Sequence, residues 1–102
     1  MSELEIIKDL LVAHKGKDNQ ITAAEIARIL RYNEDDTHAK TRALVKKSIK
    51  KHCLPVAGTE NGYYYMTQRS DLDKYIDNLN GRIEKIAERR DMVIKNFEEN
   101  KL

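Results

Sequence analysis

The spacing of apolar residues along the chain predicts several helices, and the first runs from Ser2 to Ala13. Leu4, Ile6, Ile7, Leu10 and Leu11 recur there at intervals of one helical turn or less. Ser2 and Glu5 have the spacing of a capping box, in which each residue's side chain accepts a hydrogen bond from the other's backbone amide. Gly16 marks the break after this helix.

A second, shorter helix is predicted from Ala23 to about Arg31 or Tyr32. Thr22 and Glu25 form another capping box at its start, and alanines favour helix over the first turn. Its apolar stripe is narrow and consists of Ile26, Ile29 and Leu30. Ile21, immediately ahead of the helix, is placed to form a very short strand.

A third helix is expected from about His38 to His52, after the acidic turn Glu34–Asp36. Asp36 or Thr37 is suited to cap it. At about 100° per residue one arc of this helix is mostly apolar and the opposite arc is strongly basic. The first arc holds Thr41, Leu44, Val45, Ser48 and Ile49; the second holds Ala39, Lys40, Ala43, Lys46, Lys47, Lys50 and Lys51, with His38 and Arg42 at the edge.

Pro55 ends this helix, and the period then changes to that of strands. Residues 54–57 and 63–66 are rich in strand formers, and the glycines of residues 58–62 supply a turn, which together predict a β-hairpin. The loop is expected to span about five residues and to project as a wing. Because side chains alternate along a strand, Tyr64 should oppose Tyr63 and Tyr65, with one of the three rings exposed.

The longest element is a C-terminal helix introduced by a capping box at Ser70 and Asp73. Its apolar positions alternate at intervals of four and three residues, which is typical of a coiled-coil seam, and Arg90 is the polar exception. A helix from Asp71 to Glu98 would be about 42 Å long. The seam predicts self-association, and its residues are Leu72, Ile76, Leu79, Ile83, Ile86, Arg90, Val93 and Phe97.

The orientation of such a pair stays open at this point. A parallel pair is favoured by Ile76 and Ile83 at one seam position with Leu72 and Leu79 at the other. Ile86 and Val93 break that preference. The seam arginine would need a carboxylate, which Asp91 or Glu88 of a second helix offers. We expect a homodimer.

Composition narrows the classes of protein further. The chain has 102 residues, of which 40% are hydrophobic, and this suits one compact domain. Neither a transmembrane segment nor a signal peptide is evident, and a lone Cys53 allows neither an internal disulfide nor a cysteine cluster for zinc. We therefore expect a cytoplasmic protein that needs no cofactor and no metal.

The charges are strongly segregated although the formal net charge is only +2. Residues 37–59 contain no acidic residue and six cations, Lys40, Arg42, Lys46, Lys47, Lys50 and Lys51. The 13 remaining basic and 17 acidic residues leave the rest of the chain negative. This polarity would turn one face of the molecule toward a polyanion.

The order helix, short strand, helix, turn, basic helix and hairpin resembles the winged helix-turn-helix fold. The residues that carry the likeness are 21–30, which resemble the first helix of a helix-turn-helix, residues 41–47 at the recognition-helix position, and the hairpin. Leu54-Pro55-Val56 and Gly62-Tyr63-Tyr64-Tyr65 are similar to the "Ile-Pro-Ile … Gly-Tyr-Tyr" hairpin of many small prokaryotic and phage winged-helix proteins. The predicted fold class is therefore mainly α with a small β-hairpin: a winged helix-turn-helix domain over residues 1–69 and a long dimerisation helix over residues 70–102.

The resemblance implies sequence-specific binding of double-stranded DNA, with the third helix in the major groove and the hairpin at the backbone. Base readers would be Thr37, His38, Lys40 and Arg42, of which Arg42 is best suited to guanine. Phosphate contacts would come from Lys46, Lys47, Lys50 and Lys51, and hairpin contacts from Thr59 and Asn61. A dimeric transcriptional regulator or a phage or plasmid accessory factor is the leading expectation.

The alternatives are a protein adaptor and a plain solvated lysine face. On the same fold, the basic helix would serve an adaptor or phage-encoded modulator as a docking surface for an acidic protein. Catalysis has little support, because no phosphate loop or metal-ligand cluster is evident, and His14, His38 and His52 have no evident carboxylate partners. We expect a non-enzyme.

Overall fold

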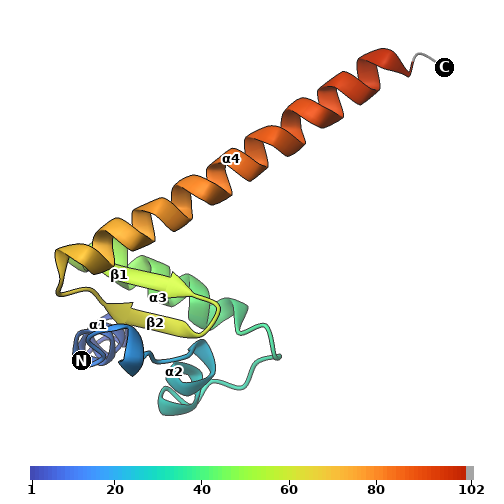
Figure 1. Cartoon of the computed structure of the whole chain (residues 1–102). Coiled ribbons are helices and arrows are strands. Elements are labelled where there is room, and N and C mark those ends of the chain that lie inside the picture. Colours follow the sequence, from blue (N-terminus) through green and yellow to red (C-terminus); the bar gives the residue numbers. More distant parts are fainter. Residues whose placement is uncertain (101–102) are drawn as a thin grey trace. The chain divides into compact units, whose positions relative to one another are not determined.

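The computed structural model describes residues 1–100 and is mainly helical, with one small β-hairpin (Figure 1). The chain divides into two compact units, one of residues 1–71 and one that begins at Leu72. This confirms the expected fold class of helices, a hairpin and a long C-terminal helix. Its elements are α1 (Glu3–Ala13), the 3₁₀ turn η1 (Lys17–Asn19), α2 (Ala23–Ile29), α3 (Ala39–His52), β1 (Val56–Thr59), β2 (Gly62–Tyr65) and α4 (Arg69–Glu99).

Ser2 and Thr22 cap the first two helices as expected, but within residues 1–100 only one of the two bonds of the box predicted at Ser2 and Glu5 is formed. The Ser2 hydroxyl accepts a hydrogen bond from the Glu5 amide at 3.2 Å. Thr22 and Glu25 form both halves of a capping box, with each backbone amide 3.1 Å from the other residue's side-chain oxygen. These bonds satisfy amides that a helix N-terminus otherwise leaves unpaired.

Helix α2 is shorter than predicted, and its apolar stripe differs. It ends at Ile29, because Leu30 already serves as its C-cap. Ile29 is 51% exposed, whereas Ala27 is buried beside Ile26. The predicted stripe was therefore wrong at Ile29, because the side of α2 that faces the core is formed by Ile26, Ala27 and Leu30.

The capping box gives a stability prediction. Its hydrogen bonds from Thr22 lower the pKa of Glu25 below its ordinary value of 4.5. The contribution of the carboxylate is therefore complete above pH 4.5 and is lost as the pH falls below it. We expect Glu25→Gln to lower the free energy of unfolding by about 0.5–1 kcal/mol at pH 7, and the deficit to be smaller at pH 3, below the ordinary pKa. Urea unfolding at both pH values measures this; an equal deficit at pH 7 and pH 3 would contradict it.

Helix α3 begins differently from the prediction. Its N-cap is His38, whose backbone is left-handed at φ 52° and whose side chain makes no capping hydrogen bond. Thr37 lies one residue ahead of this N-cap, and its amide and hydroxyl both donate to the Asp35 carboxylate, which lowers the pKa of Asp35. The prediction of Asp36 or Thr37 as the cap was therefore wrong.

The buried face of α3 is the arc that the periodicity predicted. Thr41, Val45 and Ser48 are buried, and Leu44 and Ile49 pack at the edge of the core. The core itself consists of Ile7, Leu11, Ile21, Ile26, Val45 and Val56. The buried Ser48 hydroxyl is satisfied, because it donates to the Leu4 carbonyl of α1 at 2.8 Å.

The hairpin has a much shorter loop than predicted. Strands β1 and β2 are antiparallel and pair from Val56 with Tyr65 to Thr59 with Gly62, which leaves only Glu60 and Asn61 between them. The projecting five-residue wing was therefore a wrong prediction. None of the three tyrosines is exposed: Tyr64 is buried, and Tyr63 and Tyr65 pack against the core.

The outer edge of β2 is also paired, which explains the short strand expected at Ile21. Ile21 and Tyr63 exchange two backbone hydrogen bonds of 2.9 and 2.8 Å. Farther along, the Tyr65 amide donates to the His14 carbonyl, and the Gly16 amide donates to the Tyr65 carbonyl. The hairpin is thereby tied to the segment between α1 and α2.

The long helix α4 begins at Arg69, so Ser70 lies in its first turn rather than ahead of it. The capping box predicted at Ser70 and Asp73 was therefore misplaced.

No helix within residues 1–100 is long and apolar enough to cross a membrane.

Candidate nucleic-acid interface on α3

The solvent face of α3 carries a cluster of unpaired cations. Arg42, Lys46, Lys47, Lys50 and Lys51 are all exposed. Within residues 1–100 none of these five side chains forms an ion pair with a carboxylate. We call them the α3 cationic face.

Small residues occupy the same face near the start of the helix. Ala39 and Ala43 are exposed and lie one turn apart, in line with Lys46 and Lys50 of the later turns. Along this line the first two turns of α3 present alanines and the last two turns present lysines, while Lys40 and Arg42 lie to either side of it. This arrangement lets another molecule approach the helix backbone most closely at its N-terminal half.

The other predicted base readers are held by contacts inside the fold. The Thr37 hydroxyl donates to Asp35, and His38 is half-buried with its Nδ1 3.1 Å from Oε1 of Glu34. The Lys40 ammonium lies 4.2 Å from the centre of the Tyr32 ring, a cation–π contact. Arg42 is thus the one candidate base reader that makes no such contact within the described chain.

Glu34 is the residue that sequence reasoning missed. Its Oε1 accepts a hydrogen bond from the Thr41 hydroxyl at 2.6 Å and stands beside His38, so the expectation that His38 lacks a carboxylate partner was wrong. The four-residue spacing of Glu34 and His38 was the available signal. Oε2 of Glu34 is buried with no hydrogen-bond partner in the structure. A carboxylate here also complements the positive end of the α3 dipole.

Tyr32 links the loop before α3 to the first helix. Its hydroxyl donates to the Glu3 carboxylate, and burial together with this hydrogen bond raises the pKa of Tyr32 to about 12. Since the ammonium of Lys40 lies over the same ring, Tyr32 connects α1 with the first turn of α3. The start of the basic helix is therefore held from two sides, by Tyr32 and by Glu34.

The two predicted hairpin contacts have different surroundings. Thr59 is half-buried, and its hydroxyl donates to the Gln20 side chain at 2.6 Å and accepts from the Asn61 amide at 3.1 Å. Thr59 therefore holds the turn together. Asn61 is exposed at the tip of the turn, where its side-chain amide can reach a ligand.

The predicted dimerisation residues all lie on α4. Leu72 and Leu79 are half-buried, whereas Ile76, Ile83, Ile86, Arg90, Val93 and Phe97 are exposed.

Among residues 1–100 no group of three or more histidine, cysteine, aspartate or glutamate side chains is placed to hold a metal ion. Cys53 is exposed and ends α3 with a left-handed backbone.

Comparison with known proteins adds no family. A scan against protein-family models and searches of curated proteins and of solved structures find no match to this chain. The exposed cations of α3 and the contacts around its first turn are therefore the features that indicate a function.

Proposed function

We propose that residues 1–69 form a winged helix-turn-helix domain that binds duplex DNA with α3 in the major groove. The order of elements supports this: α1, the Ile21 bridge, α2, α3 and the hairpin follow one another as that fold requires. The supporting surface is the α3 cationic face.

The observation that carries the proposal is the absence of any carboxylate partner for the α3 cationic face among the described residues. Like-charged pairs such as Lys46 with Lys50 and Lys47 with Lys51 stand one turn apart and weaken a helix slightly. This arrangement does not stabilise the isolated domain. It favours binding to a duplex, because each lysine that contacts a phosphate releases condensed counterions.

The small side chains on the solvent face of the N-terminal half of α3 suit entry into the groove. The major groove is wide enough to admit a helix, and the residues near the start of a recognition helix meet the base edges there. Ala39 and Ala43 permit this approach, and the Arg42 guanidinium has the two donors that guanine accepts. Thr37, His38 and Lys40 act mainly by fixing the start of the helix, because each has a contact inside the fold.

The acidic turn limits where phosphates are contacted. Glu34, Asp35 and Asp36 precede α3 and would repel the backbone of the duplex, so the phosphate contacts fall to the lysines of the last two turns. The two-residue hairpin turn leaves Asn61 as the side chain that reaches a phosphate. Its part in the interface is therefore smaller than that of a long wing.

The biological role that fits best is a transcriptional regulator or a phage or plasmid accessory factor. We expect fluorescence anisotropy with a random duplex of about 20 base pairs to show binding at about 50 mM salt, with log K falling against log salt at a slope of about −4. A duplex selected from a random pool should bind about 10³-fold more tightly or better. No binding at that salt concentration would overturn the proposal and favour an adaptor that docks on an acidic protein.

A further inference from the structure

Helix α4 carries an apolar stripe on its own surface that is interrupted only at Arg90 within the seam. Ile76 is 42% exposed, Ile83 and Ile86 are 62% and 63% exposed, and Phe97 is 82% exposed. All of these residues belong to the seam of alternating four- and three-residue intervals. A stripe with this period fits the side chains of a second helix with the same period, because each knob then enters a hole of the facing helix.

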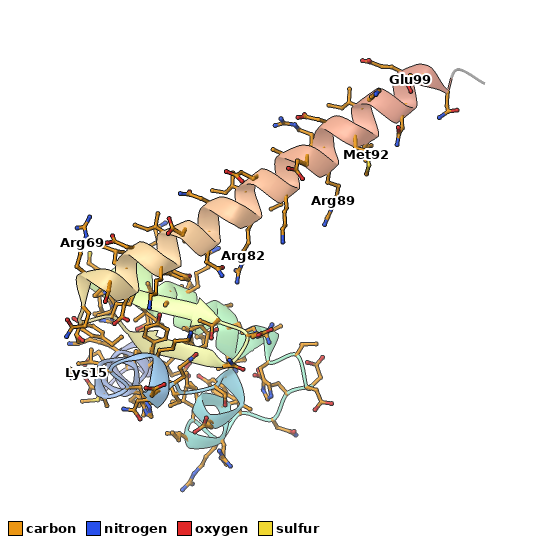
Figure 2. All side chains as sticks on the ribbon, in the orientation of Figure 1. Lys15, Arg69, Arg82, Arg89, Met92 and Glu99 are labelled. Atoms are coloured by element: carbon orange, nitrogen blue, oxygen red, sulfur yellow. The ribbon has the colours of Figure 1, made fainter. Side chains whose placement is uncertain are left out.

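The two sides of this seam have opposite charge. One side is an acidic row of residues seven apart, Asp77, Glu84, Asp91 and Glu98. The other side carries Arg82, Lys85 and Arg89, and Figure 2 shows Arg82 and Arg89 on one side of α4. Among residues 1–100 neither arginine forms an ion pair, and neither do Glu84 and Glu98. We call these two sides the acidic flank and the basic flank.

This polarity distinguishes the two orientations of a pair. In a parallel pair the basic flank of each helix is on the same side of the pair as the acidic flank of the other, whereas in an antiparallel pair like flanks share a side. We propose that α4 forms a parallel, in-register coiled coil with α4 of a second copy of this chain. The two flanks then complement each other twice, once on each side of the shared seam.

Side-chain lengths allow the flanks to meet. In the parallel pair Arg82 stands beside Ala87 of the second copy, and Arg89 stands beside Ile94 of the second copy. The small Ala87 leaves room for a guanidinium to reach Glu84 or Asp91. The long stem of Arg89 covers Ile94 and keeps its charge at the acidic flank.

The seam arginine is accommodated by its own neighbour. Arg90 forms an ion pair with Asp91, with Nε and one terminal nitrogen each 2.9 Å from Oδ1, and its side chain is 66% exposed. The guanidinium therefore lies toward the acidic flank, where Asp91 balances it. A single polar seam residue of this kind fixes register and strand number at some cost in stability.

Two measurements on the full chain without DNA test the pair and its orientation. Light scattering after size exclusion at about 50 μM should give the mass of two chains; a single-chain mass would overturn the proposal. Spin labels placed singly at Lys74 and Lys95, with Cys53→Ser, should each give distances below about 25 Å in a parallel pair. In any antiparallel pair, the distance along the axis between the two labels at residue 74 and that between the two labels at residue 95 sum to at least about 63 Å. At least one of these distances would then be about 31 Å or more, and such a distance would overturn the parallel orientation.

Charge reversal tests the flanks separately. The double variant Arg82→Glu/Arg89→Glu makes both flanks acidic, and we expect its dimer dissociation constant to rise about tenfold or more at about 50 mM salt and about threefold or less at about 500 mM. The matched control Lys74→Glu/Lys95→Glu carries the same charge change on the outer face and should leave the constant within about twofold. Equal effects of the two variants would overturn the role of the flanks.

Discussion

The triple variant Lys46→Ala/Lys47→Ala/Lys50→Ala is expected to lose duplex DNA binding by about 10²–10³-fold at about 50 mM salt. Each phosphate contact contributes about 0.9 to the slope of log K against log salt, so three lost contacts should flatten the slope by about 2.7. All three lysines are exposed and unpaired within residues 1–100, so the loss reflects their action on DNA. Anisotropy at four or more salt concentrations gives both numbers.

The matched control removes the same charge elsewhere. Lys17→Ala/Lys74→Ala/Lys95→Ala takes away three exposed lysines outside α3 and should change the slope by less than about 0.5. The test variant should also melt at or slightly above the wild-type temperature, because alanine favours helix and the repulsion between Lys46 and Lys50 is gone. Equal losses in the two triple variants would show that α3 has no special part in binding.

Gly62→Ala is expected to destabilise the protein by about 3–5 kcal/mol. Gly62 has φ 128°, and a Cβ there would stand 2.6 Å from the Ile21 carbonyl oxygen and 2.9 Å from its carbon. These are backbone atoms, so the clash cannot be relieved by a change of rotamer. Relief requires breaking the two Ile21–Tyr63 hydrogen bonds, which adds to the strain of a positive φ.

The same substitution at Gly81 is the control, and its expected effect has the opposite sign. Gly81 lies inside α4, and a Cβ there meets no atom within 4 Å. Gly81→Ala should therefore stabilise α4 by about 1 kcal/mol. Thermal unfolding followed by circular dichroism should show a fall of about 12 °C or more for Gly62→Ala. A fall of less than about 4 °C would show that the hairpin edge tolerates a side chain.

The buried and exposed faces of α3 could be predicted from the local pattern of apolar and basic residues. Thr41, Val45 and Ser48 were expected inside and the lysines outside, and both are observed. The helical period fixes which residues share a face, and burial of apolar surface is the main driving force of folding. The candidate interface was predictable for the same reason, since the lysines occupy the face that the core leaves free.

The N-cap of α3, in contrast, could not be predicted from the local sequence. The sequence favoured a cap at Asp36 or Thr37, yet the helix begins after a left-handed His38. The reason lies in contacts from two directions: Glu34 binds Thr41 seven residues ahead, and Tyr32 binds Glu3 on another helix. Local capping preferences are worth about 1 kcal/mol, so contacts of this kind override them.

Sequence alone determined the mainly helical class, the position of the hairpin, the two faces of α3 and the heptad stripe of α4, because each follows from period and from residue type over a short window. Tertiary structure decided the length of the hairpin loop, the packing of all three tyrosines and the contacts that engage His38 and Lys40 within the fold. The loop length follows from the register of β1 with β2, and Ile21 and residues 14–16 pair with the other edge of β2. Pairings between residues far apart in sequence leave no periodic signal, and only the folded chain brings them together.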